Sequence, residues 1–159
     1  MKPLKLNWKR TGYSESGKET GPAHLVTKTV NLGNVLQVYY RVMATKYLKR
    51  PRGTDPWRVE IRVSTIDQAW DFYHNGKTFA EVKALAFKEI NDKLESMKKK
   101  AEERGTLISQ ISAIYKKHGQ KIISIFGAHT TSNLREHLAA LQDGKFNHKN
   151  CAECQANKG

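Results

Sequence analysis

The sequence predicts an α+β fold, in which a small antiparallel sheet of three or four strands packs on one long helix and a helical C-terminal section follows. Three observations predict it. Apolar and charged residues alternate strictly over residues 57–63, which is typical of a half-buried strand. Apolar residues recur at three- and four-residue steps over residues 79–97, which indicates an amphipathic helix. Capping residues and glycines then occur within residues 105–144 in the order that is typical of helix starts and ends.

The N-terminal half is expected to form a basic arm and then the first strands. Residues 1–23 are polar and carry five Lys/Arg against two Glu, so we expect an arm there. Residues 24–30 are rich in β-branched side chains, and residues 35–43 resume the extended pattern after a glycine-containing turn. Prolines and a glycine mark residues 46–56 as a loop before the alternating strand at 57–63.

The long helix has a predicted start and a predicted end. A short fourth strand over residues 70–73 is followed by an Asn-Gly turn. Thr78 and Glu81 have the spacing of a capping box, in which each side chain accepts from a free backbone amide. We expect the helix to run from about residue 79 to 104 and to end at Gly105, a residue common just past helix ends.

The C-terminal third is also expected to be helical. Thr106 is placed to cap a helix over residues 107–118, and the polar cluster at 130–133 offers caps for a final helix to about Gln142. The predicted organisation is therefore an arm (1–23), a sheet-plus-long-helix domain (24–104), a helical section (105–144) and a polar tail with a Cys-x-x-Cys (145–159).

The charge of the chain favours a polyanionic partner. Its 159 residues include 28 Lys/Arg and 15 Asp/Glu, for a formal net charge of +13. Such a charge favours nucleic acid, because Lys and Arg release counterions from phosphates; an acidic protein surface is the second option and an anionic membrane the third. No stretch approaches the roughly 20 apolar residues of a membrane span, and the expected partners are nucleic acid or an acidic protein surface, with no membrane. Two cysteines make no disulfide framework, and no secretory signal is apparent, so the cytosol is the expected compartment.

The main candidate nucleic-acid interface is the basic and aromatic stretch from Tyr39 to Arg62, whose aromatic residues are Tyr39, Tyr40, Tyr47 and Trp57. It interleaves aromatic residues with seven Lys/Arg, and only two acidic residues oppose them. Cations track a phosphate backbone, while aromatic rings stack on unpaired bases. The candidate contact residues are Arg41, Lys46, Tyr47, Lys49, Arg50, Arg52, Trp57, Arg58 and Arg62. Tyr47 and Trp57 are the candidate stacking residues. The alternative places Trp57 in the core and the cations on a solvated strand face.

The order of the predicted elements resembles, in outline, small sheet-plus-helix modules that bind DNA or RNA. This resemblance covers residues 24–104, about half of the chain, and it rests on element order.

A helix-turn-helix is the second candidate. Four polar residues, Thr131, Ser132, Asn133 and Arg135, would lead the final helix, as suits a helix that reads the major groove. The alternative is a helical hairpin that completes the core or forms a homodimer contact.

The third candidate is a zinc site on the tail. His148, Cys151 and Cys154 have the spacing of zinc ligands, and zinc requires a fourth. The candidates for that fourth ligand are His137, His129 and His118. The alternative is a pair of reduced, exposed thiols.

The tail also resembles the end of the HNH nucleases, in which a cysteine pair precedes Asn or His and Lys. Here Cys154 is followed by Asn157 and Lys158, but the Asp-His pair of those enzymes is missing, and Ala128-His129 stands in its place. Metal-assisted hydrolysis needs a general base beside the ion. The favoured function is therefore non-enzymatic nucleic-acid binding with a regulatory or accessory role. A small inhibitor or adaptor that binds an acidic protein surface comes second, and a zinc-dependent nuclease third.

Overall fold

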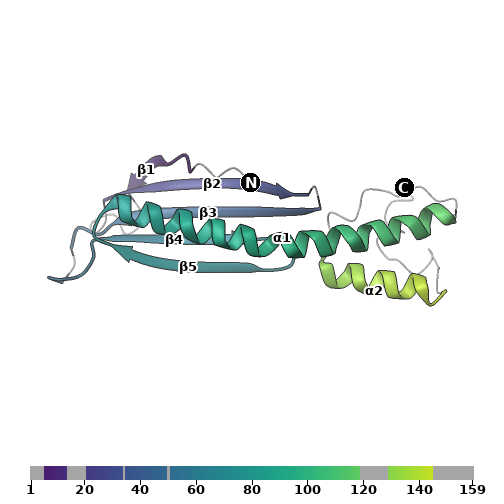
Figure 1. Cartoon of the computed structure of the whole chain (residues 1–159). Coiled ribbons are helices and arrows are strands. Elements are labelled where there is room, and N and C mark those ends of the chain that lie inside the picture. Colours follow the sequence, from purple (N-terminus) through teal and green to yellow (C-terminus); the bar gives the residue numbers. More distant parts are fainter. Residues whose placement is uncertain (1–5, 14–20, 34, 50, 119–128, 145–159) are drawn as a thin grey trace. The chain divides into compact units, whose positions relative to one another are not determined.

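The computed structural model describes residues 6–13, 21–33, 35–49, 51–118 and 129–144 (Figure 1). The chain divides into two compact units, Met1–Ala101 and Glu102–Gly159. The α+β prediction is confirmed, since the first unit contains an antiparallel sheet and the long helix, and a second helix follows. Within the described residues, no helix combines the length and the apolar character needed to cross a bilayer.

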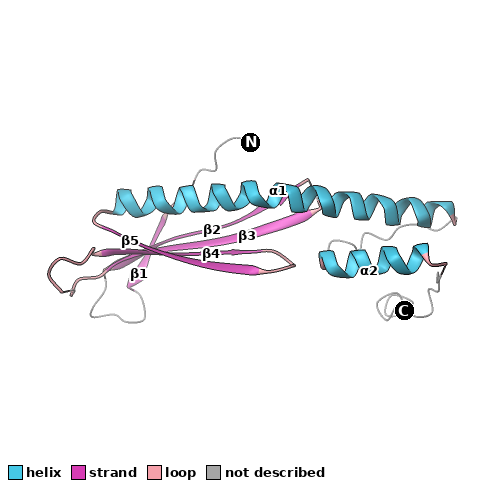
Figure 2. Ribbon diagram, turned by 60° about the horizontal axis from the view of Figure 1, so that its bottom comes forward, coloured by secondary structure: helices cyan, strands magenta, loops and turns pink. Residues whose placement is uncertain are grey.

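The sheet is a meander of antiparallel strands, each paired with its neighbour in the chain (Figure 2). In the described residues these strands are β1 (Lys9–Tyr13), β2 (Pro22–Leu32), β3 (Leu36–Lys46), β4 (Trp57–Ser64) and β5 (Ala69–Gly76). The turn between β2 and β3 requires a left-handed backbone at Gly33, whose φ is +59°, and glycine adopts this without a Cβ clash. Because the register continues without a shift from His24–Ala44 to Leu32–Leu36, the alternation of side chains is kept across both strands.

Helix α1 (Phe79–Lys117) lies along one face of this sheet over its first part (Figures 1 and 2). The apolar stripe predicted from the sequence is the one that packs there, and it includes Val82, Ala86, Ile90, Leu94 and Met97. It meets the inward side chains of the two central strands, which are Leu36, Val38, Tyr40, Val42, Ala44, Val59, Ile61 and Val63. Each fully buried aliphatic side chain contributes roughly 1.5–3 kcal/mol, so this layer provides most of the stability of the unit.

The start of α1 is fixed by a cap and by an aromatic cluster. The amide of Glu81 donates to Thr78 Oγ1 (3.1 Å), and the Glu81 carboxylate accepts from the amide of Lys77 (2.8 Å). Phe79 stacks on Trp57 with ring centroids 4.8 Å apart and also contacts His24 at 4.3 Å. Burial of the imidazole, with Arg10 and Lys83 nearby, lowers the pKa of His24 below its usual value.

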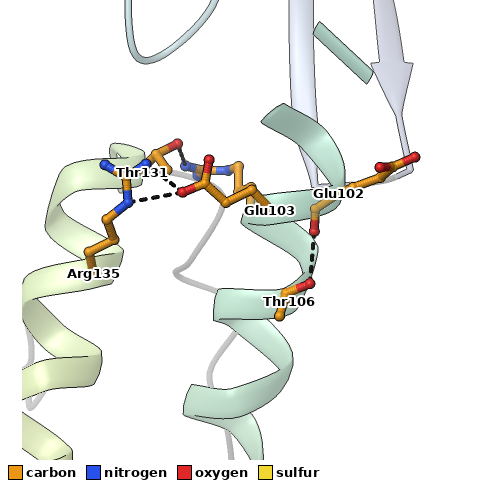
Figure 3. Close-up of polar contacts among 6 residues, drawn as sticks. Glu102, Glu103, Thr106, Thr131 and Arg135 are labelled. Carbon is orange, nitrogen blue, oxygen red and sulfur yellow. Dashed lines mark hydrogen bonds and ion pairs between the residues drawn. The ribbon is translucent and has the colours of Figure 1, made fainter. Parts of the chain in front are cut away.

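The second unit contains the end of α1 and helix α2 (Thr131–Gln142). Its core consists of Ile111, Tyr115, Leu134 and Leu138. Arg104 is fully buried and donates to the carbonyl oxygen of His129 and to Thr131 Oγ1 (3.4 Å). Arg135 of α2 forms an ion pair with Glu103 of α1 (Figure 3). These contacts hold the N-terminal end of α2 against α1.

Two predicted boundaries are wrong. Residues 9–13, expected in a mobile arm, form β1, so the described sheet has five strands rather than three or four. The long helix does not end at Gly105 but continues to Lys117. Glycine in a helix interior costs only about 1 kcal/mol relative to alanine, and the packing of Ile111 and Tyr115 exceeds this. The Thr106 hydroxyl, expected to cap a new helix, instead donates to the Glu102 carbonyl oxygen within α1 (3.1 Å; Figure 3).

Candidate nucleic-acid interface

The sheet presents one face away from α1, and this face carries polar, cationic and aromatic side chains. In β3 the side chains alternate between buried and exposed, which assigns Tyr39 and Arg41 to the face opposite the core. In the described part of residues 1–101, no helix or strand lies over this face (Figure 2). We call it the open face, and its central residues are Tyr39, Arg41, Met43, Arg58, Glu60, Arg62, Asp71 and Tyr73.

Two arginines stand directly opposite each other at the centre of the open face. Arg41 of β3 pairs in register with Arg62 of β4, which in turn pairs with Asp71 of β5. Arg62 Nε lies 3.7 Å from Asp71 Oδ1, in an ion pair whose side chains are 60% and 46% exposed. Among the described residues, Arg41 has neither an ion-pair partner nor a hydrogen-bond partner for its guanidinium. The pair therefore retains an uncompensated positive charge in the middle of the sheet.

Next to these arginines, Tyr73 is held by a third arginine. The guanidinium carbon of Arg58 lies 4.8 Å from the centroid of the Tyr73 ring, a distance typical of a cation–π contact. Arg58 Nε also lies 3.3 Å from Glu60 Oε1. Tyr73 remains 58% exposed, so one side of its ring is supported while much of its surface faces solvent.

A groove of about 190 Å³ lies between these side chains. Its lining residues are Arg41, Met43, Glu60, Ile61, Arg62, Asp71 and Tyr73. Tyr39 lies two residues before Arg41 on the same strand and face, and it is 41% exposed. The groove therefore combines two arginines, the carboxylates of Glu60 and Asp71, an aromatic ring and the soft thioether of Met43. Because Asp71 pairs with Arg62, the guanidinium of Arg41 is the cation that stays available to a ligand there.

The predicted loop cations lie in the connection between β3 and β4. Lys46 is exposed at the end of β3, and Lys49 and Arg52 are exposed in the loop. Arg50 lies outside the described residues. Tyr47 is half-buried, and its amide donates to the Pro56 carbonyl oxygen (2.7 Å), which closes the base of this loop.

Of the two predicted stacking residues, Trp57 does not share the open face. Its ring packs on Phe79 and lies 6.1 Å from the His24 ring, on the side of the sheet covered by α1. The structure thus places Arg41, Arg58 and Arg62 on one face of the sheet, while Trp57 is partly buried and packs against the core on the other face.

Sequence reasoning included Tyr39 in the candidate stretch but did not select it as a contact residue, and it missed Tyr73 as a site residue. The signal that identifies them is strand parity, because Tyr39 has the same parity as Arg41 in β3, and Tyr73 the same as Asp71 in β5. Applying it required the register between strands, and the register became available only with the structure.

The residues expected to lead a recognition helix lie at the N-terminal end of α2. Arg135 pairs with Glu103, and Thr131 accepts from Arg104, so both contact α1. Ser132 and Asn133 are exposed, and the Ser132 hydroxyl donates to Glu136 within the same helix (3.3 Å). Three of the four side chains therefore already make contacts inside the second unit.

The predicted zinc ligands His148, Cys151 and Cys154 lie outside the described residues. The fourth, His137, has Nε2 3.0 Å from the Tyr115 hydroxyl, and the two rings stack. In the portion of the chain that the structure describes, no three His, Cys, Asp or Glu side chains gather in a metal-binding arrangement.

No family model matches the chain, and no curated protein or solved structure has significant similarity to it. The functional interpretation therefore depends on the residues of this chain.

Proposed function

We propose that this protein binds nucleic acid without acting on it chemically, and that the open face and the β3–β4 loop make the contact. A regulatory or accessory role in the cytosol fits such a binder. The proposal uses no metal ion, and zinc on the tail stays a separate prediction.

The observation that carries the proposal is the pairing of Arg41 with Arg62. Like charges directly opposite each other in a sheet are destabilising, so this pair is not explained by the stability of the fold. A phosphate between the two guanidiniums would offset the repulsion, and arginine suits phosphate because its planar fork can donate two parallel hydrogen bonds.

The surrounding charge supports the same partner. Lys46 is exposed at the end of β3, Lys49 and Arg52 are exposed in the loop that follows, and Arg58 lies on the same face of β4 as Arg62. Together with the net charge of +13, these cations would attract a phosphate backbone over a distance of about one Debye length.

A titration of labelled oligonucleotides tests the proposal. The double variant Arg41→Glu/Arg62→Glu should weaken binding by at least tenfold, measured by fluorescence anisotropy at 50 and 200 mM salt, since two phosphate contacts become repulsive. Lys99→Glu is the matched control, because Lys99 is an exposed cation on α1, away from the open face, and should leave most of the affinity intact.

The result that would overturn the proposal is the absence of binding to single-stranded or duplex DNA or RNA at low salt. In that case the acidic protein surface becomes the favoured partner. Binding that both the double variant and Lys99→Glu weaken equally would also contradict the proposed interface.

A further inference from the structure

We infer that the nucleic acid on the open face is single-stranded, with Tyr39 and Tyr73 stacking on two bases and with Arg41 and Arg62 holding the phosphates between them. This inference rests on the proposed function and names the class of its ligand.

The first argument is the exposure of two aromatic rings on one face. The large hydrophobic residues exposed in the described part of the chain include Tyr39 (41%) and Tyr73 (58%), and both lie on the open face. The Arg58 guanidinium packs on the Tyr73 ring and so restricts its orientation before any ligand arrives. A restrained aromatic ring loses little entropy when a base stacks on it.

The second argument is the order of the side chains along the sheet. Tyr39 is in the row of Ser64, Arg41 and Arg62 form the next outward row, and Tyr73 is in the row after that. Rows on one face are two residues apart, so the tyrosines are separated by about 13 Å along the strands and about 10 Å across them. The two rings are therefore about 16 Å apart on the diagonal, with the arginine pair between them.

This spacing suits an extended single strand. Stacked bases in a duplex rise only about 3.4 Å along each strand, so the two tyrosines would hold bases that are not neighbours. The intervening backbone then crosses Arg41 and Arg62. In a duplex the base faces are covered by neighbouring pairs, so duplex contact would leave both tyrosines without a function, whereas every unpaired base offers a face for stacking.

The test compares oligonucleotides of one sequence as single-stranded DNA, single-stranded RNA and duplex DNA. The variant Tyr39→Thr/Tyr73→Thr removes both rings but keeps residues that favour strands. Loss of one base–aromatic stack corresponds to roughly a 5- to 150-fold loss of affinity, so the double variant, which removes two stacks, should lose at least about 25-fold on the single strands. Duplex binding should be unchanged, because it depends on the phosphates alone.

Three controls separate stacking from other effects. Tyr39→Phe/Tyr73→Phe should bind single strands with an affinity close to that of the wild type, because the rings are kept and only the hydroxyls are lost. Phe87→Ala removes an exposed aromatic ring from α1 and should have no effect. A single strand made of abasic nucleotides keeps the phosphates without the bases, and it should bind weakly and equally to the wild type and the threonine variant.

The outcomes distinguish this inference from the proposed function. If the duplex binds as tightly as the single strands and the threonine variant binds like the wild type, the inference fails while the proposed function stands. If no oligonucleotide binds at low salt, both fail. Equal affinity for DNA and RNA single strands supports recognition through bases and phosphates. A higher affinity for one of them supports the same recognition together with a contact to the sugar.

Discussion

Arg41 lies opposite Arg62 in the β3–β4 ladder, and this arrangement opposes folding as much as it favours an anionic ligand. We therefore expect Arg41→Thr to raise the free energy of unfolding, by a few tenths to about 1 kcal/mol, because it removes the repulsion and places a β-branched residue in a strand. Urea denaturation measures the change. The same variant should bind single strands more weakly, with the slope of log affinity against log salt reduced by about 0.7.

A variant that is both less stable and unchanged in binding would contradict this account of Arg41. Glu103→Gln serves as a control for changes of surface charge, since Glu103 pairs with Arg135 in the second unit. Its effect on single-strand affinity should be small.

Tyr40 illustrates a different conflict at a single residue. Its ring is fully buried in the main core, and its hydroxyl has no hydrogen-bond partner among the described residues. Burial raises the pKa of Tyr40 to about 12. We expect Tyr40→Phe to stabilise the protein by about 1 kcal/mol, since it removes an unsatisfied buried hydroxyl and keeps the ring.

The pH dependence of stability provides a second measurement on Tyr40. The folded state keeps the phenolic proton of Tyr40 to a higher pH than the unfolded chain does. The Tyr40 hydroxyl therefore leaves the free energy of unfolding unchanged below pH 10 and lowers it as the pH rises toward about 12. Unfolding followed from pH 8 to 11 should show a smaller alkaline loss in Tyr40→Phe than in the wild type. An equal loss in both proteins would mean that other groups dominate.

At the scale of the elements, the attachment of α2 depends on a buried cation. Arg104 donates to the carbonyl oxygen of His129 and to Thr131, which flank the start of the helix. Arg104→Leu should leave both acceptors without their donor and reduce the stability of α2 by roughly 2–3 kcal/mol. Hydrogen exchange should then quicken over residues 131–142 and stay slow in β3 and β4. Faster exchange throughout the chain would indicate a wider role for Arg104.

The elements were predicted well where one periodic signal dominated. Alternation located β4, and the apolar stripe and the cap located the start of α1. The C-terminal end of α1 was misplaced because Gly105 and Thr106 are local signals, while the helix continues through packing of Ile111 and Tyr115. β1 was missed because its five residues form a strand through pairing with β2, and no pattern within residues 9–13 themselves predicts that pairing.

The candidate site was predicted in part for a related reason. Arg41, Arg58 and Arg62 were identified by charge, which is visible in the sequence. The assignment of Trp57 to the core and of Tyr73 to the open face depends on which residues of neighbouring strands stand opposite each other. That information lies in the register, and register depends on contacts between distant residues.

For the whole molecule, the charge of +13 predicts that salt has two opposite effects. Screening reduces self-repulsion in the compact state, so Tm should rise between 20 and 300 mM salt. Affinity for nucleic acid should fall over the same range, because the release of each counterion gains less free energy at a higher salt concentration. Differential scanning calorimetry and anisotropy on one preparation measure both. A Tm that falls with salt would show that ion pairs such as Arg62–Asp71 outweigh the net repulsion.

The meander order of the strands has a consequence for synthesis on the ribosome. Each strand pairs with the one made just before it, so the sheet can assemble by successive hairpins as the chain emerges. Its apolar side has no cover until residues 82–97 of α1 follow, about one to five seconds later at ordinary elongation rates. During that interval Val42 and Ile61 face water, and nascent chains of this length are the ones we expect chaperones to protect.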